Sequence, residues 1–178
     1  MADCEFCMIV RGDFESEEIY SDDDVFAVMH LKPAAPGHIL LFTKQHYSIV
    51  EQIPDKIVGH LLSVANKLSI AIFESVGAQG TNIIVENGVA SGQTVPHVSV
   101  HIIPRRENDG LNLQWTPKKL NNDEMDVVQY QLKEQAQNIA SIELETVKKK
   151  TAPEEKKDEK KKMGSPNDHR IRQLRRIP

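Results

Sequence analysis

Residues 93–105 read Gln-Thr-Val-Pro-His-Val-Ser-Val-His-Ile-Ile-Pro-Arg, and this stretch decides the fold. Apolar and polar residues alternate along it, which predicts a β-strand over His97–Pro104 with one face in the core. Every second residue from Val98 belongs to the core face, and the polar face carries His97, Ser99 and His101. Successive residues on one face lie roughly 6.5–7 Å apart. We therefore expect the polar face to contact adjacent parts of one ligand.

An ordinary surface strand could also carry two exposed histidines, so the strand alone leaves that alternative open. The preceding loop contains Asn87-Gly88 and then Gly92-Gln93-Thr94. Glycines let backbone N–H groups approach a ligand closely, and the Thr94 hydroxyl suits a phosphate oxygen. Loop and strand together favour a phosphate-binding site.

The remaining patterns predict the rest of the architecture. Apolar residues at spacings of three and four predict a helix from Pro54 to about Ser75, with Gly77 as its stop, and a polar helix follows over Met125–Ile142. Three more strands are predicted at Asp24–Leu31, Gly37–Thr43 and Thr81–Glu86. The order ββαββα favours the α+β class, with an antiparallel sheet, a long central helix and a C-terminal helix.

The strand and its loop resemble the signature of the histidine-triad (HIT) family, Gly-Gln-Thr/Ser-Val-x-His-x-His-x-His-x-x-Pro-Arg. The resemblance runs from residue 4 to about residue 120 and includes the segments Pro36-Gly37-His38-Ile39-Leu40 and Lys44-Gln45-His46. It implies the HIT fold, a two-fold homodimer and purine nucleotide binding, with cleavage or transfer of nucleoside monophosphates. In this resemblance His38 orients the triad from behind.

Ser99 stands where the family has its middle histidine, the nucleophile that attacks the α-phosphate and forms a nucleotidyl-histidine intermediate. A serine hydroxyl needs a base within hydrogen-bond reach to attack near neutral pH. We therefore expect nucleotide binding with hydrolase activity absent or much reduced, Ser99 marking the vacated position and His101 remaining as the catalytic-site histidine. The alternatives are an active hydrolase that uses Ser99 differently, a trap mutant of one, and an adaptor or scaffold.

Two further positions depart from the family pattern. His30 stands where the family carries Asp or Asn that holds the ribose hydroxyls, and Glu86 stands where it carries Asn or Gln near the phosphates. A carboxylate there repels phosphate unless it is protonated or paired with a cation. Together with Ser99, these changes favour a diverged site over a single engineered substitution. The resemblance implies that the nucleotide-binding residues are His30, Glu86, Asn87, Gln93, Thr94 and His101.

Cys4 and Cys7 are the two cysteines of the chain, and their spacing supplies half of a tetrahedral zinc site. The resemblance to cysteine-bearing HIT proteins supplies the other two ligands, His46 and His97. Such a zinc would be structural, because four protein ligands leave no open position. Free thiols or a reversible disulfide are the alternatives.

Composition bounds the remaining possibilities. The chain has 178 residues and a net charge of −4, which gives no general attraction to nucleic acid or anionic lipid. No apolar run approaches the roughly 18–20 residues that span a bilayer, and the polar N-terminus is no secretory signal. We expect a cytoplasmic protein with no membrane partner.

The composition changes near residue 147. We expect a HIT domain over residues 1–146, followed by a charged linker and a basic tail over residues 147–178 that is too polar to form a core. In the tail, Ile171, Leu174 and Ile177 alternate with arginines. Residues 163–178 are therefore either a disordered basic end or a docking motif for a protein or RNA partner.

Overall fold

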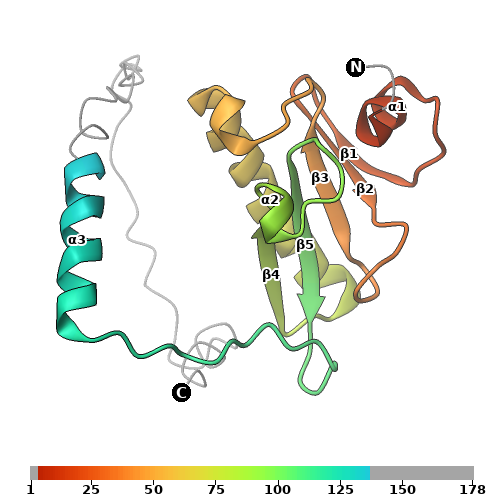
Figure 1. Ribbon diagram of the computed structural model, residues 1–178. Helices are drawn as coiled ribbons and strands as arrows, with labels where there is room; N and C mark the ends of the chain where they lie inside the picture. The colour runs from red at the N-terminus through yellow and green to blue at the C-terminus, as the bar shows by residue number, and fades with distance from the viewer. Residues whose placement is uncertain (1–3, 137–178) are drawn as a thin grey trace, which may run out of the picture. The chain divides into compact units, whose positions relative to one another are not determined.

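The computed structural model describes residues 4–136. The chain divides into two compact units, and the boundary along the sequence lies between Trp115 and Thr116. The second unit contributes one helix, α3 (Asn122–Ala136). The first unit contains the elements labelled in Figure 1: α1 (Glu5–Arg11), β1 (Glu18–Ser21), β2 (Val25–Met29), β3 (Ile39–Thr43), α2 (Asp55–Val76), β4 (Gly80–Val85) and β5 (Ser99–Arg105), with short 3₁₀ turns at Val50–Gln52 and Val89–Ser91.

The five strands form one sheet in the order β1-β2-β3-β5-β4, and every neighbouring pair is antiparallel. The register places Leu40 opposite His101 and Phe42 opposite Ser99. These pairings put the polar positions of β5 in the middle of the sheet, between β3 and β4. The predicted α+β class with an antiparallel sheet and a long helix is confirmed.

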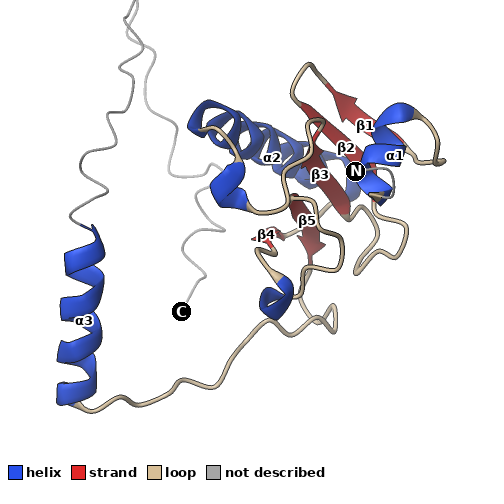
Figure 2. Cartoon of the chain, turned by 45° about the horizontal axis from the view of Figure 1, so that its top comes forward, coloured by secondary structure: helices blue, strands red, loops and turns tan. Residues whose placement is uncertain are grey.

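One face of the sheet packs against α2, as Figure 2 shows from a second direction. The helix begins after Pro54 and ends at Gly77, which has a left-handed φ of +64°. Residues with a side chain adopt this conformation only at an energetic cost. Burial of large aliphatic side chains against one another stabilises this layer by roughly 1.5–3 kcal/mol for each residue. The buried members of this cluster are Val25, Ala27, Ile39, Leu41, Leu61, Val64, Ala65, Leu68, Ile72, Ala78, Val100 and Ile102.

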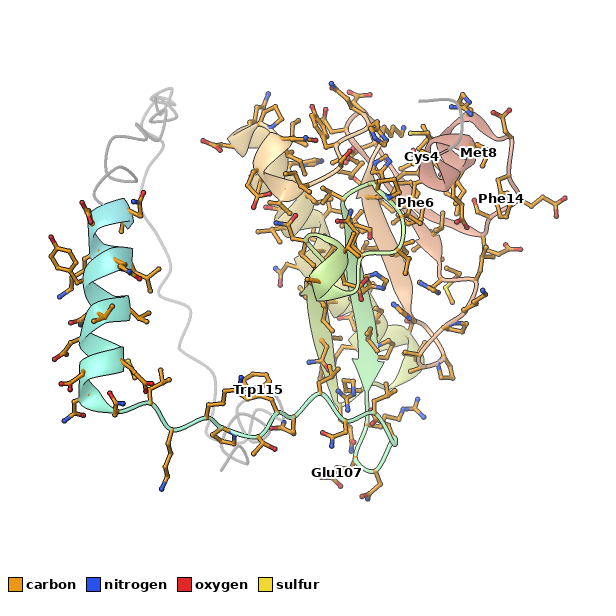
Figure 3. All side chains as sticks on the ribbon, viewed as in Figure 1. Cys4, Phe6, Met8, Phe14, Glu107 and Trp115 are labelled. Atoms are coloured by element: carbon orange, nitrogen blue, oxygen red, sulfur yellow. The ribbon has the colours of Figure 1, made fainter. Side chains whose placement is uncertain are left out.

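The opposite face is covered in part by the short helix α1. Phe6 stacks on Phe42 with ring centroids 4.7 Å apart, and Ile9 joins the same buried cluster as Val28 and Leu40. Figure 3 shows Cys4 and Phe6 at this helix. Because strand residues alternate between faces, Ser99 and His101 emerge on this α1 side of the sheet, while Val100 and Ile102 lie in the α2 core.

Within residues 4–136, α2 is the one helix that is long and apolar enough to cross a bilayer by length and composition. Its buried residues, Leu61, Val64, Ala65, Leu68 and Ile72, pack on the sheet. That packing is the arrangement of a core helix in a globular domain.

The structure corrects several predicted boundaries. Strand β5 begins at Ser99, so His97 precedes the strand instead of lying on it. Helix α3 begins three residues earlier than predicted, because the Asn121 side chain accepts from the Glu124 N–H while the Glu124 carboxylate accepts from the Asn121 N–H. The predicted helix residues 137–142, the boundary at 146, the linker and tail over 147–178 and the docking motif over 163–178 lie outside the described residues and stay predictions.

Candidate functional site

Two cysteines and two histidines meet where α1 approaches the residues before β5. The Sγ of Cys4 lies 3.4 Å from Nδ1 of His97, and the Sγ of Cys7 lies 3.4 Å from Nδ1 of His46 and 3.6 Å from Nδ1 of His97. A tetrahedral zinc with bonds of about 2.3 Å to sulfur and 2.0–2.1 Å to nitrogen requires sulfur and nitrogen ligands about 3.6 Å apart. The predicted ligand set is therefore brought together at the spacing of a metal centre.

The orientation of the His97 ring also suits a metal. Its Nε2 lies 2.8 Å from the carbonyl oxygen of Thr43, and a carbonyl can only accept, so Nε2 carries the proton. The lone pair of Nδ1 consequently faces the two sulfur atoms. A metal-bound histidine needs this arrangement, with one nitrogen donating to a backbone carbonyl and the other bound to the ion. Burial, opposed by the hydrogen bond to Thr43 and assisted by the nearby His46, lowers the pKa of His97 to about 4, so the ring is neutral at pH 7.

The Cys7 thiol is protonated when no metal is bound. Burial raises the pKa of Cys7, and its hydrogen bond with Cys4 raises it further. Metal ions bind thiolates, so metal uptake releases the Cys7 proton. Four soft or borderline ligands in tetrahedral spacing fit zinc, and they leave no position for a substrate.

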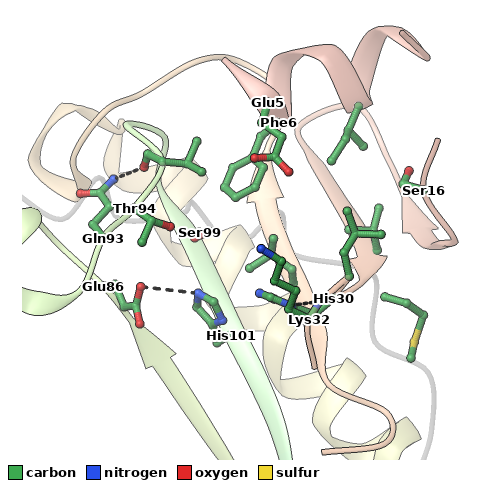
Figure 4. Close-up of a pocket in the computed structure, with 16 residues that line it drawn as sticks. Glu5, Phe6, Ser16, His30, Lys32, Glu86, Gln93, Thr94, Ser99 and His101 are labelled. Carbon is green, nitrogen blue, oxygen red and sulfur yellow. Dashed lines mark hydrogen bonds and ion pairs between the residues drawn. The ribbon is translucent and has the colours of Figure 1, made fainter. Parts of the chain in front are cut away.

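A pocket of about 200 Å³ opens on the same face of the sheet, beside this cluster (Figure 4). Its polar lining comes from β5, from the end of β4, from the glycine loop and from the turn after β2. Ser99 and His101 both line it from β5, and the Glu86 carboxylate lies beside His101, 3.9 Å from its Nε2. The side chains that line it belong to Glu5, Phe6, Ile9, Ser16, Val28, Met29, His30, Leu31, Lys32, Leu40, Glu86, Gln93, Thr94, Val95, Ser99 and His101.

Three histidines form a second cluster at this pocket. Nε2 of His38 lies 3.1 Å from Nδ1 of His101, and the ring of His30 stacks on that of His38 at 4.5 Å between centroids. The backbone N–H of Ala34 donates to Nδ1 of His38 at 3.1 Å. His38 is therefore protonated on Nε2 and donates to His101, which leaves the proton of His101 on its own Nε2. That nitrogen lies 3.9 Å from the Glu86 carboxylate.

The His38 and His101 rings stay neutral near pH 7. Burial, together with repulsion from the neighbouring His30 and His101, lowers the pKa of His38 to about 4. Burial also lowers the pKa of His101, with Glu86 opposing the shift and His30 adding to it. His101 is consequently a neutral N–H donor at the pocket floor, held in one orientation by His38.

The loop before β5 is held by its own side chains. The Gln93 carbonyl oxygen accepts from the Gly88 N–H, and its amide nitrogen donates to the carbonyls of Ser48 and Val95. Its side-chain groups are therefore engaged in fixing the loop. Gly92 has a φ of +103°, and a Cβ there would lie 3.3 Å from the Glu86 carboxylate, so this position needs glycine.

The predicted nucleotide-binding residues separate into two groups. His30, Glu86, Gln93, Thr94 and His101 line the pocket, as does Ser99, which was predicted as the vacated nucleophile position. Asn87 lies outside the lining, because its amide accepts from the Val50 N–H and donates to Glu51. Lys32 and Glu5 line the pocket without having been predicted. Glu5 comes from α1, whose seven residues give no periodic signal, whereas Lys32 follows the predicted strand end closely enough to have been considered.

Comparisons with known proteins agree with this geometry. The model of the HIT domain family matches residues 11–108. The chain therefore belongs to the HIT domain family. A curated relative, "Adenylylsulfatase HINT3" of Arabidopsis thaliana, is 36% identical over 118 residues, which is 66% of this chain but 58% of that relative's length.

Solved structures share the fold. The histidine triad nucleotide-binding protein from Candida albicans superposes with a TM-score of 0.69 at 26% identity, covering 77% of this chain and 99% of that one. A zinc-bound histidine triad family protein from Mycobacterium smegmatis superposes with a TM-score of 0.61 at 28% identity, covering 77% of this chain and 98% of that one.

Proposed function

We propose that the pocket binds a purine nucleotide or a related phosphate compound and that the route through a covalent nucleotidyl-enzyme is lost. The observation that carries this proposal is the state of His101. Its Nδ1 is occupied by His38 and its Nε2 is directed at Glu86. Within residues 4–136 no hydrogen bond joins the Ser99 hydroxyl to an imidazole, so the serine has no base to activate it.

The phosphate end of the ligand is assigned to the floor of the pocket. The Nε2–H of His101 and the hydroxyls of Thr94 and Ser99 supply hydrogen-bond donors there. The relative named an adenylylsulfatase and the solved nucleotide-binding protein support a nucleotide as the ligand class. The Glu86 carboxylate repels negative charge at this end. It therefore favours a ligand that places little negative charge beside His101.

The four-ligand cluster is proposed to hold a structural zinc. The spacing of the sulfur and nitrogen atoms and the exposed lone pair of His97 support the metal, and the zinc-bound neighbour supports its identity. This zinc would fix α1, and with it one wall of the pocket, to the residues before β5. The thiol pair, which a structural metal needs reduced, fits a reducing compartment such as the cytoplasm.

A homodimer is proposed to form through β4 and the neighbouring face of α2. β4 is an edge strand, and its large apolar residues Ile83 and Val85 are 43% and 37% exposed. On α2, Ile70 and Phe73 are also exposed. An apolar patch beside an unpaired strand edge is a surface that a second copy can cover.

The nucleophile assignment is tested with a labelled nucleoside phosphoramidate and a dinucleoside polyphosphate. Ser99→His is expected to hydrolyse them at least about 100-fold faster than the natural chain, because it restores an imidazole that forms a labile phosphoramidate. Calorimetric titration with AMP and GMP measures binding by both proteins. Turnover by the natural chain at the rate of Ser99→His would contradict the loss of the covalent route, and absence of binding by either would contradict the ligand class.

The dimer is tested by light scattering after size exclusion. The natural chain is expected at twice its mass of 20.1 kDa. Phe73→Lys places a charge in the patch and is expected to give the monomer mass. Ile19→Lys, on the exposed opposite edge strand β1, is the matched control and should remain dimeric. A monomeric natural chain would contradict the interface.

A further inference from the structure

The side of the pocket opposite Glu86 is built to donate hydrogen bonds. The backbone N–H of Lys32 donates to Nδ1 of His30 at 3.0 Å, so Nδ1 is the acceptor of this ring and the ring proton lies on Nε2. Figure 4 shows that ring edge directed into the pocket, with the Lys32 side chain beside it. This side therefore presents an imidazole N–H and an ammonium group, neither of which accepts a hydrogen bond.

The donor at His30 is held in place before any ligand arrives. The ring stacks on His38 with an angle of 13° between the planes, and the Lys32 N–H fixes its rotation. His38 is itself buried and fixed by Ala34. A donor that loses no freedom on binding contributes more of its hydrogen bond to affinity.

The pocket thus has two separate positions that attract an oxyanion. One is at His101 with Thr94, and the other is at His30 with Lys32, the rings of His101 and His30 lying 5.5 Å apart between centroids. A phosphate chain that continued past His101 would meet the Glu86 carboxylate, 3.9 Å from Nε2 of His101. A second phosphate is therefore favoured at His30 and disfavoured beyond His101.

We propose that the ligand is a nucleotide that carries a second phosphate on its ribose. This inference rests on the proposed function, because it assumes that the 5′-phosphate lies at His101. The sugar phosphate accepts from Nε2–H of His30 and from the Lys32 ammonium. An unsubstituted ribose hydroxyl gains less there, because it lacks the charge that strengthens these bonds.

The test is a calorimetric titration at about 0.15 M salt, where long-range charge attraction is screened. The probes are AMP, ADP, adenosine 3′,5′-bisphosphate and adenosine 2′,5′-bisphosphate, with the guanosine series alongside. ADP has the same number of phosphates as the bisphosphates, so it controls for charge. At least one bisphosphate is expected to bind about tenfold or more tightly than ADP, because one charge-assisted hydrogen bond changes the dissociation constant by about that factor. The two isomers decide which ribose position carries the phosphate.

Variants of the donor side separate a specific subsite from general charge. His30→Phe keeps a ring to stack on His38 but removes the N–H, and should bring the bisphosphate and ADP affinities together. His30→Asp should invert the preference toward AMP. Lys32→Gln should weaken bisphosphate binding, whereas Lys67→Gln on the exposed face of α2 should not. Melting temperatures verify that each variant is folded.

The outcomes are distinct. Binding of AMP or GMP with no preference for a bisphosphate over ADP overturns this inference and leaves the proposed function standing. A preference that survives in His30→Phe also overturns it. No binding of any probe overturns both.

Discussion

Two histidine clusters lie on the same face of this sheet, and they differ in which edge of the ring faces the cluster. In both clusters, each ring whose Nδ1 or Nε2 is bonded to a backbone group carries its proton on Nε2. At His97 that proton is donated to a backbone carbonyl, so the bare Nδ1 faces the cysteine sulfurs. At His30 and His38 the Nδ1 atoms accept from backbone N–H groups, so the protonated Nε2 atoms face the other residues.

The difference separates a metal site from a ligand site. His30, His38 and His101 lie close enough together to hold an ion, but a metal would have to displace the protons on Nε2 of His30 and His38 while their Nδ1 atoms still accept from the backbone. Proximity of histidines is therefore insufficient to identify a metal site. In each ring, one nitrogen is bonded to a backbone group and the other faces the cluster. A backbone carbonyl on the first nitrogen leaves a lone pair facing the cluster, whereas a backbone N–H leaves an N–H donor facing it.

The largest expected effect comes from breaking the cysteine cluster. Cys4→Ser removes a zinc ligand from a buried position, and should abolish stoichiometric zinc and lower the free energy of unfolding by on the order of 4 kcal/mol or more. Metal analysis of the purified chain should give about one zinc, and chemical denaturation measures the stability.

The matched control for this loss lies in the other cluster. His30→Phe and His38→Gln should each retain one zinc per chain, because those rings present protons. A second equivalent of zinc in the natural chain that disappears in His30→Phe would contradict the distinction between the clusters. A metal-free chain of unchanged stability would contradict the zinc proposal.

The next effect is a pH dependence of stability that originates at His38. Its pKa is about 4 in the folded chain and about 6.5 when unfolded. As the pH falls below about 6.5, His38 binds a proton in the unfolded chain but stays neutral in the folded chain. The free energy of unfolding is therefore highest above pH 6.5. It decreases by roughly 3 kcal/mol as the pH falls to about 4.

The measurement compares denaturation midpoints of the natural chain and His38→Gln from pH 7.5 to pH 4. Glutamine can accept from the Ala34 N–H and donate to His101, but it does not titrate. All other groups are common to both chains, so the difference between the two profiles reports His38 together with its coupling to His30 and His101. Parallel profiles would mean that the ring is protonated as easily in the folded state, which would contradict the neutral donor described above.

Sequence patterns predicted the central part of this domain well because burial leaves a periodic signal. The alternation in β5 and the three-and-four spacing in α2 both correspond to residues in one core cluster. β1 was missed because all four of its residues are exposed, and α1 because seven residues are too few for a periodic pattern. Both elements are positioned by tertiary contacts such as the stacking of Phe6 on Phe42.

The sequence predicted most polar residues of the site, although Asn87 lies outside the pocket and Lys32 was missed. It could not predict which nitrogen of each ring carries the proton. Motif spacing and family resemblance together pointed to His30, Glu86 and His97, and the structure places each at a polar cluster. Which nitrogen of each ring faces its neighbours depends on the backbone groups of Thr43, Lys32 and Ala34. No pattern of side chains carries that information, because it arises from where the chain turns.

The smallest expected effect comes from removing the negative charge of Glu86, which lies beside His101. Glu86 raises the pKa of His101 against the lowering by burial, and its carboxylate is one-third exposed, so the interaction is worth at most about 1 kcal/mol. Glu86→Gln should lower the pKa of His101 further, as measured by NMR titration of the ring, and should strengthen AMP binding a few-fold by removing repulsion from the phosphate. The cysteine cluster shares no contact with Glu86, so its zinc content should not change. Weaker AMP binding in Glu86→Gln would mean that the carboxylate accepts from the ligand, and the phosphate would then have to be assigned to the His30 side of the pocket.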